Sequence, residues 1–320
     1  MSVEALQIEG NEAAWARAAD AVATVAGFDC RALHQRISYA LGRQIFFVGG
    51  APKSGTTWLQ MLLDGHPEVS CGGEGHFIGG LLPGLKTALE SQNRVIIAKN
   101  QSVFRELKGF PVFGERHLFY LAAAGALLLM LEHAGGKRLR ALGEKTPDNV
   151  EHFWWLLALV PTAKFIHIVR DPRDCAVSAW YHNRRVEPRW LEERFRTMQE
   201  FVRYYVDRWA TGVGEGVAFG RSHPDRYLEF RYGDLLEDTE GTLSRALAFL
   251  GVEPNASAVR ACCEAAAFER VSGGRPRGSE DPNSLFRKGV TGDWCNYLDP
   301  ETNDYCLAAA GPLLQRFRFA

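Results

Sequence analysis

The sequence predicts an α/β fold in which helices flank a central parallel sheet in three layers. Short apolar strand-like runs alternate with helix-like segments along most of the chain, and this alternation is typical of a parallel sheet covered on both faces. A glycine-rich turn directly follows the first of these runs. The composition, 46% hydrophobic and 23% charged over 320 residues, is that of an ordinary globular protein.

The elements follow one another in a regular order. Strands are expected at residues 45–48, 68–70, 140–145, 163–169 and 226–230, and helices at 58–63, 118–131, 150–160, 176–183 and 239–250. Loops with glycine and proline are expected between residue 79 and the helix at 118. Residues 1–43 are alanine-rich with helical spacing, which predicts two short helices in front of the main domain, residues 44–320. Whether this extension is a plain appendage or serves docking or oligomerisation, as in a homodimer, stays open.

The bulk properties exclude several classes of partner. A formal net charge of -1 gives no global field that would attract nucleic acid or an anionic membrane. The longest uncharged apolar run, Leu118 to Leu131, is shorter than the roughly 20 residues that a membrane-spanning helix needs. The seven cysteines show no C-x-x-C spacing, and no His, Cys or carboxylate cluster has metal-ligand spacing. We therefore expect a soluble cytoplasmic protein with reduced thiols and no metal.

The turn from Gly49 to Leu59 predicts an anion-binding cradle. A strand, a glycine-rich loop and a helix N-terminus aim unpaired backbone N–H groups and the helix dipole at one point. Triphosphate-binding loops follow G-x-x-x-x-G-K-[ST]. Here Gly50 to Thr57 fits this frame, but Thr56 stands where the lysine belongs, and Lys53 lies inside the loop. The site is therefore P-loop-like but not built for a triphosphate, which disfavours a kinase or another nucleoside-triphosphate enzyme.

Two later segments carry further anion-binding side chains. Arg170 follows the fourth expected strand, at the carboxyl edge where ligands of such sheets bind, and Ser178 lies about two helical turns further on. An arginine suits a phosphate there because its planar fork meets two oxygens at once. The third segment runs from Phe286 to Trp294 and contains Arg287, Lys288 and Gly289.

Together, the three segments resemble the nucleotide site of sulfotransferases that use 3′-phosphoadenosine 5′-phosphosulfate (PAPS). The resemblance covers roughly residues 45–298. It implies that Lys53 contacts the oxygen that bridges phosphate and sulfate. The groups implied to hold the 5′-phosphate are Ser54, Gly55, Thr56 and Thr57; those implied to hold the 3′-phosphate are Arg170, Ser178, Arg287, Lys288 and Gly289; those implied to lie against adenine are Trp58, Tyr232 and Phe268. Asp293 and Trp294 are expected to fix the last loop, and Ala266 replaces a hydroxyl residue of the family.

The expected general base also comes from the resemblance. Cytosolic relatives often have a histidine in a K-T-H segment, but Gly143 to Pro147 contains none. This segment instead resembles the E-K-T-P segment of glycosaminoglycan-type sulfotransferases, which take their base from a glutamate in a K-E-x-H-F-like stretch. The resemblance therefore implies Glu74 as the base, His76 as the second candidate, and Lys145 as a partner of the sulfuryl oxygens. The alternative is that Glu74 is a structural carboxylate paired with Lys145 or Lys53.

These features predict transfer of a sulfuryl group from PAPS to an acceptor hydroxyl, or to an amine, with release of 3′-phosphoadenosine 5′-phosphate (PAP). The acceptor stays open between a small molecule or natural product, aromatic or lipidic, and a sugar. An aromatic pocket around Phe77, Phe104, Phe110 and Phe113 would favour the former, and the segments around Glu74 and Lys145 favour the latter. Residues 79–140 and 184–225 are expected to form the acceptor pocket. A non-catalytic nucleotide-binding protein on the same fold is the remaining alternative.

Overall fold

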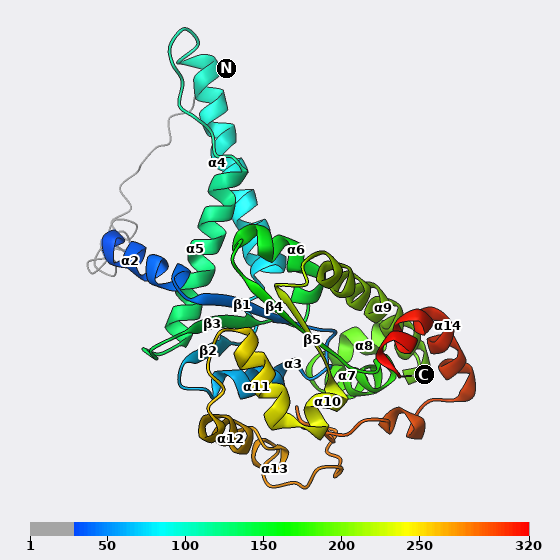
Figure 1. Cartoon of the computed structure of the whole chain (residues 1–320). Helices are drawn as coiled ribbons and strands as arrows, with labels where there is room; N and C mark the ends of the chain where they lie inside the picture. Colours follow the sequence, from blue (N-terminus) through cyan, green and yellow to red (C-terminus); the bar gives the residue numbers. More distant parts are fainter. Residues whose placement is uncertain (1–28, 320) are drawn as a thin grey trace, which may run out of the picture.

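The centre of the molecule is a five-stranded sheet in which all neighbouring strands are parallel (Figure 1). The computed structural model describes residues 29–319. The strands are β1 (Gln44–Gly49), β2 (Val69–Gly72), β3 (Ala141–Lys145), β4 (Lys164–Val169) and β5 (Tyr227–Arg231). Each lies within two residues of its predicted range at both ends. The predicted α/β class with a flanked parallel sheet is confirmed.

The strand order, β2-β3-β1-β4-β5, places β1 in the middle. The chain first moves from β1 to β2 and β3 on one side, and then crosses to β4 and β5 on the other. The order reverses beside β1, and ligands of such sheets bind in the crevice that opens at the carboxyl ends of the strands there. The loops that follow β1, β3 and β4 therefore meet at one place.

Two hydrophobic clusters cover the two faces of the sheet. One contains Phe47, Phe153 and Phe165 and joins α2, α5 and α6 to the sheet; the other contains Phe46, Leu59 and Leu247 and joins α3 and α11. The helices of this part are α2 (Cys30–Leu41), α3 (Thr56–Asp64), α5 (Glu115–His133), α6 (Asn149–Leu159), α10 (Tyr232–Glu237), α11 (Thr239–Phe249), α12 (Ala256–Ala265) and α13 (Phe268–Val271). Of the predicted helical extension, α2 is described, and residues 1–28 lie outside the described part of the chain.

A third cluster supports the carboxyl end of β4. It is built around Trp209 and Phe201 of α9 and joins α7 to the C-terminal helix. The elements are α7 (Pro172–Val186), α8 (Pro188–Arg194), α9 (Met198–Ser222), the short 3-10 helix η2 (Asp293–Asn296) and α14 (Pro300–Phe317). Much of the segment 184–225 is thus a core helix, which also holds the loop after β1, because the Tyr205 hydroxyl donates to the carbonyl of Pro52.

The prediction of loops in residues 79–114 is wrong for most of this segment. The short π-helix η1 (Phe77–Leu81) leads into α4 (Leu82–Ser102), a helix of 21 residues that forms a hairpin with α5 reaching away from the sheet (Figure 1). No residue of α4 is fully buried, so the sequence has no regular apolar face. Pro83 is accepted because it stands in the first turn, where its missing N–H is not needed.

The aromatic pocket suggested by the sequence does not form. Phe77 is buried in the core, whereas Phe104, Phe110 and Phe113 lie exposed on the far part of the hairpin. The hairpin is ordered there by two amide clamps, since Asn93 and Asn100 each exchange two hydrogen bonds with the backbone of Phe113 and Phe110. These three phenylalanines therefore lie along the hairpin, Phe113 beside Asn93 and Phe110 beside Asn100, and not with Phe77 in the core.

Between residues 29 and 319 no helix is both long and apolar enough to cross a membrane. The seven cysteines are all free thiols.

Candidate active site

The loop after β1 forms the anion cradle that the sequence predicts. Gly55 caps α3 in a left-handed conformation (φ 103°) and offers no side-chain hydrogen bond, so the first N–H groups of the helix keep their binding capacity. A Cβ atom on Gly55 would lie 2.6 Å from the Tyr232 ring, so only glycine fits. The buried Ser54 hydroxyl has no partner among residues 29–319. This loop has the donors that a phosphate requires.

Lys53 stands at the centre of the cradle in an unusual state. Its backbone is also left-handed (φ 70°), a conformation that costs free energy in a residue other than glycine. Burial of the ammonium, together with the positive charges of Arg185 and Arg170, lowers the pKa of Lys53 to about 8. A nearby anion would favour the charged ammonium and so oppose the effects of burial, Arg185 and Arg170 on this pKa. The lysine is therefore arranged to receive negative charge.

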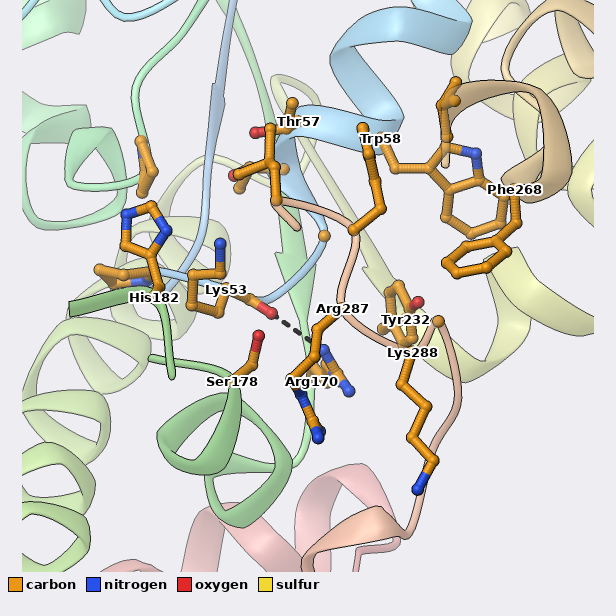
Figure 2. Close-up of a pocket in the computed structure, with 18 of the residues that line it drawn as sticks. Lys53, Thr57, Trp58, Arg170, Ser178, His182, Tyr232, Phe268, Arg287 and Lys288 are labelled. Atoms are coloured by element: carbon orange, nitrogen blue, oxygen red, sulfur yellow. Dashed lines mark hydrogen bonds between the residues drawn. The ribbon is translucent and has the colours of Figure 1, made fainter. Parts of the chain in front are cut away.

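Arg170 lies beneath the cradle and connects two of the predicted segments. Its guanidinium donates to the carbonyl of Lys53 at 3.1 Å, the dashed bond of Figure 2, and to the carbonyl of Val290 at 2.9 Å. The guanidinium also stacks on the Tyr232 ring, 4.5 Å from its centroid. Its Nε is buried and has no partner within the described chain. Figure 2 shows the Ser178 hydroxyl, from α7, facing the same space.

The C-terminal segment closes over this space and is fixed by ion pairs. Asp293 pairs with both Arg287 and Lys288 at 2.6 Å, and Glu280 pairs with Arg287 at 2.6 Å. Gly289 is left-handed (φ 70°), and a Cβ atom there would lie 2.6 Å from Phe268. Asp293 thus has the loop-fixing position that was expected. Figure 2 shows the Lys288 side chain directed away from Lys53 and Ser178.

Aromatic side chains line the far end of the cavity. The Trp58 indole donates to the carbonyl of Ala266 at 3.0 Å and meets Tyr232 edge to face at 6.0 Å between ring centroids. The Arg277 guanidinium lies 5.4 Å from the Trp58 centroid and 5.5 Å from that of Phe268. The backbone carbonyl of Ala266, rather than a side-chain hydroxyl, is the polar group at this position. These rings can hold a flat heteroaromatic base between them.

Glu74, Lys145 and His76 meet at the opposite end. The Lys145 ammonium lies 2.7 Å from Glu74 Oε1 and donates to the Thr57 hydroxyl at 3.2 Å, so it joins the candidate base to the cradle. His76 lies 3.6 Å from the other carboxylate oxygen of Glu74. The side chain of Lys145 is 3% exposed and that of Glu74 is 44% exposed, so the carboxylate faces the cavity while the ammonium supports it from below.

Glu144 shapes the loop that carries Glu74. Its buried carboxylate accepts hydrogen bonds from the Gly75 N–H, the Thr146 hydroxyl and the Asn149 amide. Burial raises the pKa of Glu144, and these three donors oppose that shift. The structure shows a hydrogen-bonded anchor for the turn between Glu74 and His76.

A single cavity joins the two ends (Figure 2). Nearly all of the predicted residues line it; Ser54 and Lys145 do not, but Lys145 donates to the hydroxyl of the lining residue Thr57. No lining residue comes from 79–140 or 184–225, so the expected acceptor role of these segments stays a prediction. Among the described residues, no group of three or more metal-ligating side chains is present.

Sequence reasoning missed three cavity residues that bear polar side chains, Asp148, His182 and Arg277. His182 follows Ser178 by one turn of α7, so the i, i+4 spacing was an available signal. Arg277 lies in a Gly/Pro/Arg-rich loop whose path only the tertiary structure defines.

Comparisons with known proteins agree with this geometry. A sequence model described as the sulfotransferase family matches residues 45–256. Protein-tyrosine sulfotransferase 1 of Mus musculus is 31% identical over 159 residues, which cover 49% of this chain and 40% of the relative. Cytosolic sulfotransferase 15 of Arabidopsis thaliana is 27% identical over 156 residues, covering 44% and 43%. The matches span only 26% to 40% of the length of three animal protein-tyrosine sulfotransferases, from Drosophila melanogaster, Gallus gallus and Mus musculus.

Solved structures show the same fold. Mouse sulfotransferase SULT7A1, crystallised with PAP, is similar with a TM-score of 0.50 and 21% identity, over 84% of this chain and 82% of that one. Sulfotransferase STF9 of Mycobacterium avium gives a TM-score of 0.52 at 14% identity, over 88% and 79%. The family match covers more than half of the chain and includes the cradle, Glu74 and Arg170. The chain belongs to the sulfotransferase family.

Proposed function

We propose that the protein transfers the sulfuryl group of PAPS to an acceptor hydroxyl and releases PAP. The observation that carries this proposal is the presence of two separate anion-binding centres in one cavity. The first is the cradle with Lys53, and the second is the space between Arg170 and Ser178. A nucleotide with phosphates at both its 5′ and 3′ positions uses both centres, whereas ATP leaves the second one empty.

The residues present fit such a nucleotide. The uncapped N-terminus of α3, the unpartnered Ser54 hydroxyl and the unpartnered Nε of Arg170 offer donors that are unused among residues 29–319. Trp58 and Phe268 border the space for adenine. In this arrangement the acceptor oxygen attacks sulfur, the bond from sulfur to the bridging oxygen breaks, and the electron pair stays on that oxygen. Lys53 stabilises the charge that develops there, and such electrostatic stabilisation is the main catalytic effect expected.

Glu74 is the proposed general base that takes the proton of the acceptor hydroxyl. It lines the cavity close to the cradle, and its ion pair with Lys145 holds the carboxylate in place there as the proposed proton acceptor. The structural ion pair that was the alternative is therefore present, and it is compatible with the catalytic role. His76 is the second candidate, because it also lines the cavity. Lys145 is proposed to assist at the sulfuryl oxygens.

A kinase would need a free carboxylate after β4, and both acids at this place are already engaged. Asp171 is engaged by Arg173, and Asp174 accepts from the backbone N–H groups of Gly292 and Trp294. Neither is available to hold a magnesium ion in the way that triphosphate enzymes use an acid at this place.

The acceptor is proposed to enter beside Glu74, where η1 and the α4–α5 hairpin begin. The similarity to protein-tyrosine sulfotransferases adds tyrosyl hydroxyls to the phenols, lipidic alcohols and sugars that a screen should cover. We also propose a cytoplasmic location, which the unpaired cysteines support.

The test has a binding arm and a turnover arm. Calorimetry should show tighter binding of PAP than of adenosine 5′-phosphate, and Ser178→Ala should narrow this difference because it removes a donor at the second centre. A PAPS-dependent acceptor screen read by mass spectrometry should find a sulfated product. Glu74→Gln should then lower turnover by about 10²- to 10⁴-fold at unchanged PAP affinity. Equal affinity for the two nucleotides, or turnover of magnesium-ATP, would contradict the proposal; an active Glu74→Gln with an inactive His76→Ala would move the base role to His76.

A further inference from the structure

His182 is a cavity-lining titratable group to which the proposed reaction assigns no role. It projects from α7 one turn after Ser178, and Figure 2 shows its imidazole beside the Lys53 side chain. It therefore belongs to the end of the cavity where the cradle meets Glu74, away from the aromatic end. A histidine in this place would ordinarily be considered as a general base.

The hydrogen bond between His182 and Arg185 argues against that role. Arg185 Nη2 lies 3.0 Å from His182 Nδ1. A guanidinium only donates hydrogen bonds, so Nδ1 must be the accepting, unprotonated nitrogen of the ring. The imidazole is then neutral, and its proton is on Nε2. The ring can offer a donor to a ligand, but its one basic nitrogen is already occupied.

The charges around the ring also favour the neutral imidazole. Burial and the positive charges of Lys53 and Arg185 lower the pKa of His182 to about 4, and the opposing effect of Glu74 is smaller. Arg185 is itself held from the other side, because its Nη1 donates to the carbonyl of Asn283 at 3.3 Å. The guanidinium thus links α7 to the segment that leads into Arg287. The tautomer of His182 is fixed by a residue that is itself anchored.

We propose that His182 is a neutral hydrogen-bond donor, through Nε2–H, to the sulfuryl group of PAPS, and that Arg185 is the positioning residue that fixes this tautomer. The inference rests on the proposed function, since it assigns the group that the donor contacts. A neutral donor suits the place, because Lys53 and Arg185 already supply positive charge to the same space. A group that must not take up the acceptor's proton also leaves the base role to Glu74.

The test compares PAPS with PAP, which lacks only the sulfuryl group, by calorimetry on the full chain. The affinity ratio of PAPS to PAP should fall about tenfold or more in His182→Ala, as expected for a lost hydrogen bond to a charged group. His182→Gln can place an amide donor near the position of Nε2 and should keep most of the ratio. Ser178→Ala, on the same face of α7, is the matched control: it should weaken both ligands and leave their ratio unchanged.

Arg185→Gln tests the tautomer. Without the guanidinium, His182 can take up a proton on Nδ1, so the PAPS to PAP ratio should rise between about pH 7 and about pH 5.5, whereas the wild-type ratio should stay flat. A ratio that is unchanged in His182→Ala, or a His182→Gln variant as weak as His182→Ala, overturns the inference. If the wild type binds neither nucleotide, the proposed function itself fails, which is a distinguishable result.

Discussion

Lys53 should take up a proton when a nucleotide binds above neutral pH. In the free protein its pKa is about 8, because the ammonium is largely buried and faces Arg185 and Arg170. The 5′-phosphate of PAP would bring negative charge to the cradle and restore the ordinary pKa of a lysine, near 10.5. The bound state therefore holds a proton that the free state has partly lost.

The size of this uptake follows from the two pKa values. At about pH 9 the free protein has lost about 0.9 of the Lys53 proton and the complex almost none, so about 0.9 proton should enter on binding; at about pH 7 the uptake should be about 0.1. Since the binding form is the protonated one, the apparent Kd of PAP should rise by up to about tenfold per pH unit above 8. The kcat/KM of the free enzyme should fall along the same limb.

Calorimetry in two buffers of different ionisation enthalpy measures the uptake directly. Lys53→Met keeps much of the side-chain length without the amine and should abolish the uptake at about pH 9. Arg185→Gln removes a positive charge that lowers the pKa of Lys53, so the uptake should shrink but not disappear. An uptake that is the same at both pH values, or that persists in Lys53→Met, would refute the assignment of Lys53 to the anion centre.

Two further predictions concern buried titratable groups. Glu144→Gln turns an amide N–H toward donors that now meet a carboxylate, so urea denaturation should show that the free energy of unfolding falls by about 1–3 kcal/mol. Turnover should also fall at unchanged PAP affinity, because Gly75 and Glu74 move. An unchanged free energy of unfolding would contradict the anchoring role. His167 is fully buried, and burial lowers its pKa to about 3. Below the ordinary histidine pKa of 6.5 the unfolded chain therefore binds a proton that the folded protein does not bind, so the folded state loses stability as the pH falls. Between about pH 6.5 and pH 4 the wild type should lose about 3 kcal/mol more than His167→Gln, and parallel urea-denaturation profiles for the two proteins would refute this.

The strands and the cradle could be predicted because their signals are local. Each buried parallel strand is a short apolar run, and the loop after β1 must combine glycine with a helix start. The order of the sheet, in contrast, comes from packing between distant segments. Helix α4 was not predicted, because it has no buried face and its sequence therefore lacks the apolar period by which helices are recognised.

Side chains that act through a neighbour were the hardest to predict. The role of His182 depends on the face of α7 from which it projects and on Arg185, whose hydrogen bond fixes the tautomer of the ring. The role of Glu144 depends on a turn 69 residues away in sequence, at Gly75. His182 carries no motif of its own, and the E-K-T-P segment does not reveal the partners of Glu144, so only the tertiary contacts show what each residue does.

The ion pairs of the C-terminal segment constrain how it can contribute to a second phosphate site. Arg287 is 6% exposed and already pairs with Asp293 and Glu280, and Lys288 shares Asp293. Breaking a buried pair by withdrawing one partner costs about 3–5 kcal/mol, so a phosphate would gain little by competing for these charges. The Nε atoms of Arg287 and Arg170 are buried and without partners among residues 29–319. We therefore expect a 3′-phosphate to add to the existing network through such free donors and the backbone N–H groups near Gly289, and to leave Asp293 paired.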